Sequence, residues 1–161
     1  MNIHHIRNAT MVLQTKDLVL LIDPMLGAQS TLPPFAFLKS KPKRNPTVPL
    51  PEKSGLVLER VTHCLITHKH PDHLDKDAIA FLVGKNIPVI CSVLDASFFS
   101  KKGLNVTQTV EYWQRTDFLG GSIEGIPARH GYGFVAKPAG NVMGFYLELP
   151  NQPSVYLSSD T

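Results

Sequence analysis

Short apolar runs recur along the chain and predict a series of β-strands. Residues 18–22 are continuously apolar, which is typical of a strand buried on both faces. A tight turn at Lys16-Asp17 joins this run to an earlier strand at 10–15. Further strands are predicted at about 61–67, 87–92, 104–110, 117–127, 142–149 and 154–159.

Two helical segments interrupt the strands. Asp75 is placed to cap the first, in which apolar residues recur at helical spacing as far as Gly84. A shorter helix is predicted from Asp95 to about Gly103. This order of elements predicts an α/β fold in which helices pack outside a mixed sheet. Residues 1–161 show no internal repeat and are expected to form one domain.

A proline-rich segment at 27–55 is expected to be a loop inserted into this domain. It holds six of the 13 prolines, and Phe35 and Phe37 are expected near its tip. Loops of this length are often lids or binding segments, with disorder as the alternative. Its cations could attract an anionic substrate, although such clusters are more often solvated loops. These cations are Lys39, Lys41, Lys43 and Arg44.

Composition excludes several classes of protein. Hydrophobic residues make up 43% and charged residues 18% of the chain, with no apolar run long enough to cross a membrane. The N-terminus lacks the pattern of a secretory signal, and Cys64 and Cys91 both lie in apolar runs typical of buried, reduced thiols. We therefore expect a cytoplasmic location. The net charge of +3 is too small to indicate a partner.

The segment His68-Lys69-His70-Pro71-Asp72-His73 concentrates metal-binding residue types directly after a predicted strand. In extended backbone, His68 and His70 point to the same side and could bind one cation. Pro71 then bends the chain, so that Asp72 and His73 reach a neighbouring point. Imidazole and carboxylate ligands suit zinc, iron or manganese, and the absence of thiolates favours a catalytic site over a closed structural one. The alternative is a surface histidine-rich turn that binds metal adventitiously.

The H-x-H-x-D-H pattern resembles the signature of the metallo-β-lactamase superfamily. The strand ending at Ile22-Asp23-Pro24 is similar to the start of that family's domain, and Ala128-Arg129-His130 occupies the place of its next histidine ligand. Residues 156–161, Tyr-Leu-Ser-Ser-Asp-Thr, resemble the strand end that supplies a bridging aspartate. The resemblance is strongest to the branch containing ascorbate-6-phosphate lactonase and N-acyl-phosphatidylethanolamine phospholipase D.

This resemblance implies one or two divalent metal ions, zinc in preference to manganese or iron. The first would be held by His68, His70 and His130, and the second by Asp72 and His73, with Asp160 bridging both. Asp72 would also be catalytic, because it could orient or deprotonate the attacking water.

Several of these residues have simpler interpretations. Taken alone, His130 is a loop residue and Asp160 a strand-end aspartate. Asp23 resembles a group that supports the loop at residues 68–73, here called the metal loop, from behind. It could equally be a strand terminator. Ser159 stands where the family usually has glycine. The remaining histidines match no ligand position and are interpreted as structural or exposed; they are His4, His5 and His63.

The family's domain is an αββα sandwich of two similar halves, and its last histidine ligand follows the bridging aspartate. The chain ends at Thr161, so the resemblance implies the N-terminal part plus the first strands of the second half. We therefore expect a weaker second metal site. A fragment, a shortened gene product and a chain completed by a partner, such as a homo-oligomer, are the alternatives.

The resemblance favours a metal-dependent hydrolase that uses metal-bound hydroxide on an ester-like bond of a small anionic substrate. Lactones, phosphoesters and phosphodiesters are the favoured classes. One alternative is a metal-binding but catalytically silent domain that acts through a partner. Another is a nuclease, which the absence of an aromatic and basic stripe disfavours.

Overall fold

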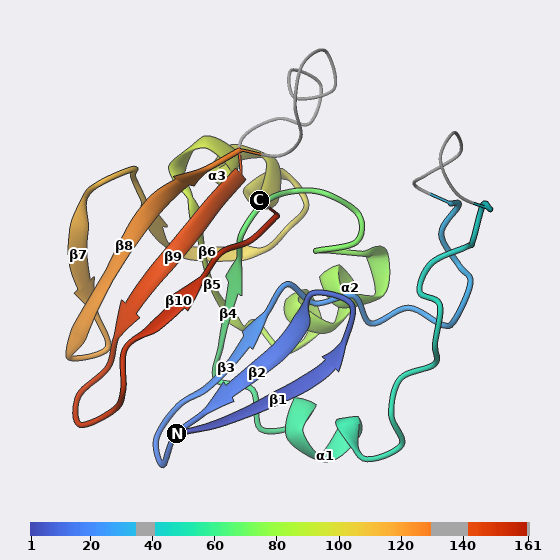
Figure 1. The fold of residues 1–161 in the computed structure, drawn as a ribbon, viewed down its shortest axis with the longest axis horizontal. Coiled ribbons are helices and arrows are strands. Elements are labelled where there is room, and N and C mark those ends of the chain that lie inside the picture. Colours follow the sequence, from blue (N-terminus) through green and yellow to red (C-terminus); the bar gives the residue numbers. More distant parts are fainter. Residues whose placement is uncertain (35–40, 130–141, 161) are drawn as a thin grey trace.

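The computed structural model describes residues 1–34, 41–129 and 142–160. Its larger sheet has six strands in the order β1-β2-β3-β4-β5-β6, antiparallel from β1 to β3 and parallel from β3 to β6 (Figure 1). These strands are β1 (Asn2–Arg7), β2 (Thr10–Gln14), β3 (Val19–Ile22), β4 (His63–Ile66), β5 (Pro88–Ser92) and β6 (Asn105–Val110).

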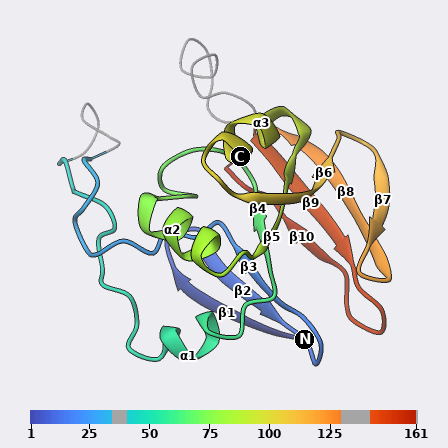
Figure 2. The same ribbon diagram turned by 180° about the vertical axis from the view of Figure 1, so that it is seen from behind.

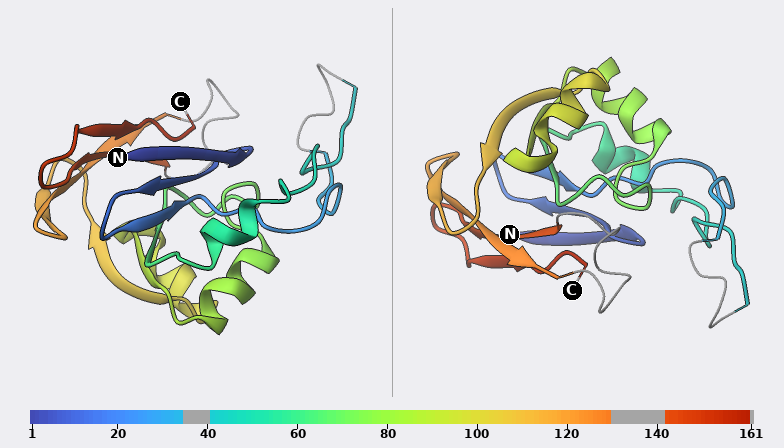
Figure 3. Two further views of the ribbon diagram at one scale, coloured as in Figure 1. Left: turned by 90° about the horizontal axis from the view of Figure 1, so that it is seen from below. Right: turned by 90° about the horizontal axis from the view of Figure 1, so that it is seen from above.

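A second, antiparallel sheet has four strands in the order β10-β9-β8-β7. They are β7 (Arg115–Phe118), β8 (Gly121–Ala128), β9 (Val142–Glu148) and β10 (Val155–Leu157). The helices are α1 (Ser54–Leu58), α2 (Lys76–Gly84) and α3 (Val93–Lys101). They lie on the face of the larger sheet that is turned away from the second sheet (Figures 2 and 3).

The alternation of side chains along the central strands produces this layering. On β3, Val19 and Leu21 point into the core beneath the helices, whereas Leu20 and Ile22 point into the core between the two sheets. Because every residue of β3 is buried, a continuously apolar strand is what the position requires. The result is a helix layer and two sheets, which are three layers of the αββα sandwich. Among the described helices, none is long and apolar enough to cross a membrane.

The predicted strand at 117–127 is wrong in one respect, because the chain reverses direction within it. β7 and β8 form a hairpin whose two linking residues, Leu119 and Gly120, have φ angles of 50° and 80°. Two positive φ angles are those of the tight hairpin turn that matches strand twist. Leucine rarely adopts this conformation, but Gly120-Gly121 is a dipeptide that marks turns, and the prediction of one continuous strand overlooked it.

Other boundaries also differ from the prediction. β1 was not predicted because its residues are mostly polar and exposed, and α1 begins inside the expected proline-rich loop. Asp75 caps α2 as predicted, its side chain accepting a hydrogen bond from the amide of Ala78. By contrast, α3 begins at Val93 and is capped by Ser92, not by Asp95.

The topology gathers chemically active residues at one edge of the larger sheet. β3, β4 and β5 are parallel, so their carboxyl ends meet at the same edge, and the residues that follow are Asp23, Thr67 and the first turn of α3. The end of β10 reaches this edge from the second sheet (Figure 1). Ligand sites of open α/β sheets form at such edges.

We predict that Gly121→Ala destabilises the protein by about 1–3 kcal/mol, because the added methyl would overlap the backbone carbonyl of Glu148 in the β8–β9 pairing. Gly84→Ala is the control, since its methyl meets nothing and removes a helical glycine. Urea unfolding should place the Gly84 variant at or above the wild-type midpoint. A Gly121 variant as stable as wild type would contradict the close approach.

Candidate metal centre

The loop after β4 presents its histidines from a compact turn. His68 follows the strand directly and is 1% exposed, and His73 is 2% exposed. The amides of His73 and Leu74 both donate to the carbonyl of His70, at 3.0 Å each. His70 and Asp72 remain half-buried, between this turn and solvent. The turn thus brings residues 68 to 73 to one place without further secondary structure.

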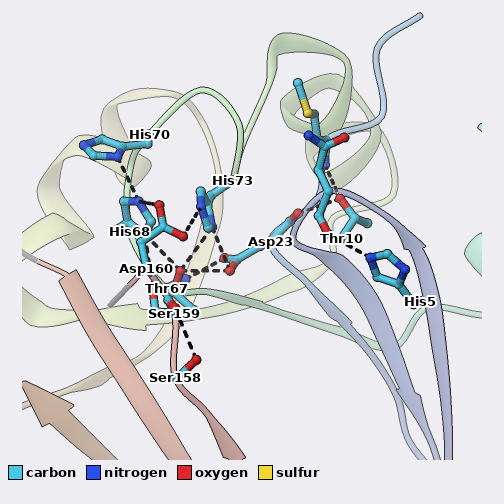
Figure 4. A network of polar contacts seen from close by, with 12 residues as sticks. His5, Thr10, Asp23, Thr67, His68, His70, His73, Ser158, Ser159 and Asp160 are labelled. Atoms are coloured by element: carbon cyan, nitrogen blue, oxygen red, sulfur yellow. Dashed lines mark hydrogen bonds and ion pairs between the residues drawn. The ribbon is translucent and has the colours of Figure 1, made fainter. Parts of the chain in front are cut away.

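Asp160 completes the cluster from the other sheet. Its Oδ1 lies 3.1 Å from Nε2 of His73, and its Oδ2 lies 3.7 Å from Nε2 of His68 (Figure 4). One carboxylate therefore faces two imidazoles with its two oxygens. Two groups result whose ligand atoms all lie within 4.8 Å of one another: His68, His70 and Asp160, and Asp72, His73 and Asp160.

Asp23 supports this cluster from behind. Its two oxygens accept hydrogen bonds from the amide and the hydroxyl of Thr67, each at 2.8 Å. Oδ2 also lies 2.9 Å from Nδ1 of His73. A carboxylate on Nδ1 fixes the imidazole so that Nε2 points toward the space beside Asp160. Of the two interpretations of Asp23 from the sequence, a group that supports the metal loop and a strand terminator, these contacts agree with the first.

The two carboxylates also change the pKa of His73. Burial alone would lower this pKa, but the hydrogen bonds to Asp160 and Asp23 outweigh burial and raise it to about 10. The proton on Nε2 occupies the side of the ring that would face a cation. Binding of a metal there would release that proton, as metal binding by histidine generally does.

The donor set fits a divalent metal ion. Ligands of a tetrahedral zinc at 2.0–2.2 Å lie about 3.3–3.6 Å apart. The Nε2 of His68 lies 2.9 Å from Nδ1 of His70 and 3.7 Å from Asp160, so shifts of a few tenths of an ångström would suffice. All donors are nitrogen or oxygen, and neither buried cysteine belongs to either group.

Two hydroxyl groups near His68 were not predicted as part of the site. Thr67 Oγ1 lies 3.0 Å from Nδ1 of His68, and Ser159 Oγ lies 3.4 Å from the same atom. Thr67 donates to Asp23, which links His68 to the carboxylate that also holds His73. Ser159 has a φ angle of 58°, which explains why glycine suits this position in the resembling family. The only sequence signal for Thr67 and Ser159 was that they directly precede His68 and Asp160.

A buried arginine connects the site to the long loop. Arg7 is 2% exposed and donates to the carbonyls of Met25 and Gly27 near the start of the loop and of Val48 near its end. The amide of Gly27 donates to Oδ2 of Asp75, at 2.7 Å, just after the metal loop. Arg7 thus joins the two ends of the loop, and the amide of Gly27 ties its start to the cap of α2. The place of Arg7 on a mostly exposed strand did not indicate this role.

The remaining predicted residues lie elsewhere. His130 and Lys39 fall outside the described residues. Lys41 and Lys43 are exposed, whereas Arg44 donates to the carbonyls of Ser30 and Thr31 within its own loop. The described part of that loop extends outward beyond α2 and away from the end of β4 (Figures 1 and 2). In this arrangement the described residues of the loop do not cover the cluster.

Among the other histidines, two exposed residues of β1 make local contacts: His4 pairs with Gln14, and His5 with the carbonyl of Asn8. His63 lies at the start of β4, at the opposite end from the metal loop.

A family model described as the beta-lactamase superfamily domain matches residues 19–161. The chain belongs to this superfamily. Membership agrees with the layered fold and with the position of the cluster at the end of β4. The predicted resemblance is thus confirmed for the superfamily as a whole.

One relative of this chain is the UPF0173 protein YddR of Bacillus subtilis (strain 168). The two are 31% identical over a match that covers all of this chain and 63% of YddR. A possible metal-dependent hydrolase from Veillonella parvula DSM 2008 has a similar crystal structure, with a TM-score of 0.86 and 32% identity over 99% of this chain and 62% of that one. The isothiocyanate hydrolase from Delia radicum gut bacteria has a TM-score of 0.84 and 28% identity, over 100% and 63% of the two chains. The chain therefore spans less than two thirds of each relative.

We predict that Asp23→Asn weakens zinc binding about 10–100-fold. An amide nitrogen facing His73 would donate a hydrogen bond to Nδ1, which leaves the proton on Nε2, where the cation should bind. Zinc titration against a competing chelator measures the change. Asp17→Asn, at an exposed carboxylate in the β2–β3 turn, is the control. Equal zinc affinity in the Asp23 variant and wild type would contradict the support that we assign to Asp23.

We also predict that Arg7→Met lowers the free energy of unfolding by about 3 kcal/mol or more, because buried carbonyl groups lose their donors. Arg60→Met, at an exposed arginine, should change it by less than about 0.5 kcal/mol. Denaturant unfolding of the metal-free protein makes the comparison. A stable Arg7 variant would show that these carbonyls find other donors.

Proposed function

We propose that the protein is a metal-dependent hydrolase. The observation that carries this proposal is the single carboxylate of Asp160, whose two oxygens face His68 and His73. Two adjacent cation positions with a shared carboxylate are the arrangement of two-metal hydrolytic sites. Two of the similar proteins, the possible metal-dependent hydrolase of Veillonella parvula and the isothiocyanate hydrolase, support the same class of reaction.

The proposed ligands divide between two positions. His68, His70 and Asp160 would hold the first cation, and the resemblance adds His130, which lies outside the described residues. Asp72, His73 and Asp160 would hold the second. A divalent cation bound here would supply Lewis-acid activation of water and of the bond under attack. Imidazole and carboxylate ligands suit zinc, manganese and iron; among the three we propose zinc first, as the family resemblance implies.

The chain's own residues would orient and deprotonate the attacking water. Asp72 is half-buried and shares a group with His73 and Asp160, so its carboxylate is placed to accept a proton at that position. Asp23 and Thr67 hold the imidazole rings of His73 and His68 in fixed orientations. Fixed ligands reduce the reorganisation that the reaction would otherwise require.

The substrate that we propose is a small molecule with an electrophilic centre open to attack by water. A lactone, phosphoester or phosphodiester fits this description and agrees with the branch of the superfamily that the sequence resembles. The isothiocyanate hydrolase among the relatives adds an isothiocyanate carbon as a further class to test. A cytoplasmic location remains part of this proposal.

We predict that Asp72→Ala lowers kcat/KM about 10²–10⁴-fold, the usual contribution of a general base. The assay uses the zinc-loaded or manganese-loaded chain with an aryl lactone, a nitrophenyl phosphodiester and an aryl isothiocyanate. Chelation of the metal should abolish turnover of whichever substrate is accepted.

Asp117→Ala, at an exposed carboxylate of β7, serves as the matched control and should keep full activity and the same melting temperature. Turnover by the Asp72 variant at the wild-type rate would exclude Asp72 as the base. Tight metal binding without turnover of any of the three substrate classes would instead favour the catalytically silent domain.

A further inference from the structure

Lys69 occupies the middle of the metal loop but faces away from the cluster. It lies between His68 and His70 in the sequence, but its side chain reaches α3 and not the carboxylates of the cluster. Its ammonium lies 3.0 Å from Oδ1 of Asp95, in the first turn of α3. This ion pair connects the loop after β4 with the helix after β5.

The Asp95 carboxylate lies in an environment that is costly for a charge. Its side chain is 1% exposed, and neither oxygen accepts a hydrogen bond of ordinary geometry from the described residues. The ammonium of Lys69 is near enough for an ion pair although its direction does not suit a hydrogen bond. Lys69 is thus the cation that compensates this buried charge within the described part of the chain. Breaking a buried pair by removing one partner is strongly destabilising.

Cys91 and Tyr112, two described residues whose pKa values respond to Asp95, cannot take over this role. Burial, with the added charge of Asp95, raises the pKa of the Cys91 thiol to about 12, and the same two causes raise the pKa of Tyr112. Tyr112 directs its hydroxyl hydrogen to the carbonyl of Val142. Both neighbours are therefore neutral, and neither supplies positive charge to the carboxylate.

We propose that Lys69 and Asp95 form a positioning pair that holds the metal loop from behind, so that His68 and His70 keep their common focus. The proposal rests on the metal site proposed above. The side chain of Lys69 is 43% exposed. An ion pair between two exposed groups would contribute little to stability. Here the buried partner cannot reach water, so the ammonium must stay in place, and the backbone on both sides of Lys69 stays with it.

A simple electrostatic role makes the opposite prediction. Lys69 carries a positive charge close to a cation site, so its removal alone should strengthen metal binding. Positioning predicts weaker binding. The double variant Lys69→Met/Asp95→Asn removes one charge of each sign, so it leaves the net charge unchanged and no unpaired buried carboxylate.

The test compares Lys69→Met, Asp95→Asn and the double variant with wild type. We expect zinc affinity to fall about tenfold or more in Lys69→Met and to stay that low in the double variant. The melting temperature of the metal-free protein should fall in Lys69→Met and recover in the double variant. Lys76→Met, at an exposed lysine beginning α2, is the charge-matched control and should keep wild-type zinc affinity.

A double variant that regains both stability and zinc affinity would overturn the proposal, because the pair would then only balance charge. Unchanged or tighter zinc binding by Lys69→Met would do the same. Hydrogen exchange of the metal-free protein tests the positioning pair without zinc. The amides of His73 and Leu74 should exchange several-fold faster in Lys69→Met than in wild type, and equal rates would count against the proposal. If the wild-type chain binds no zinc, the proposed function fails, but the exchange rates still test whether Lys69 and Asp95 hold the loop.

Discussion

The carboxylate of Asp160 is the contact on which the whole arrangement depends, because it joins the second sheet to the metal loop of the first. Its oxygens meet two imidazoles that are themselves almost fully buried. The carboxylates of Asp160 and Asp23 stabilise the protonated form of His73 by hydrogen bonds and charge, which is why its pKa is raised. A cation would take the place of that proton. Binding would therefore exchange one form of positive charge for another, while Asp23 and Thr67 keep the rings of His73 and His68 in place.

Support for the cluster comes from three directions. Asp23 follows β3, Asp95 follows β5, and both approach the loop that follows the strand between them, β4. From further out, Arg7 and Asp75 fix the beginning of the long loop against α2. Parallel strands make this convergence possible, since all their carboxyl ends open onto the same edge. The fold thus provides a rigid frame for short loops, which is the usual division between scaffold and site.

Local patterns in the sequence predicted the parts of the fold that depend on local causes. The apolar run ending at Ile22 indicated a strand buried on both faces, and Asp75 was recognised as a helix cap from its position alone. The reversal at Leu119 was missed although Gly120-Gly121 marks a turn, because a leucine with positive φ is imposed by the pairing of β7 with β8 and not by its own preference. β1 was missed for a related reason: an edge strand with exposed histidines is stabilised by its pairing with β2 and not by its own composition.

The residues of the site also fall into those that local sequence indicates and those that it does not. The motif from His68 to His73 is short, and its spacing alone indicated a shared focus, whereas Asp160 needed a family resemblance because it lies far away in sequence. Thr67, Arg7 and the pairing of Lys69 with Asp95 depend on tertiary contacts that no spacing reveals. The central claim is that these groups hold divalent cations on either side of Asp160. Anomalous diffraction from crystals of the chain grown with zinc tests it most directly. The account predicts a peak within about 2.2 Å of His68 and Asp160; zinc found only at surface histidines such as His4, with none beside Asp160, would contradict it.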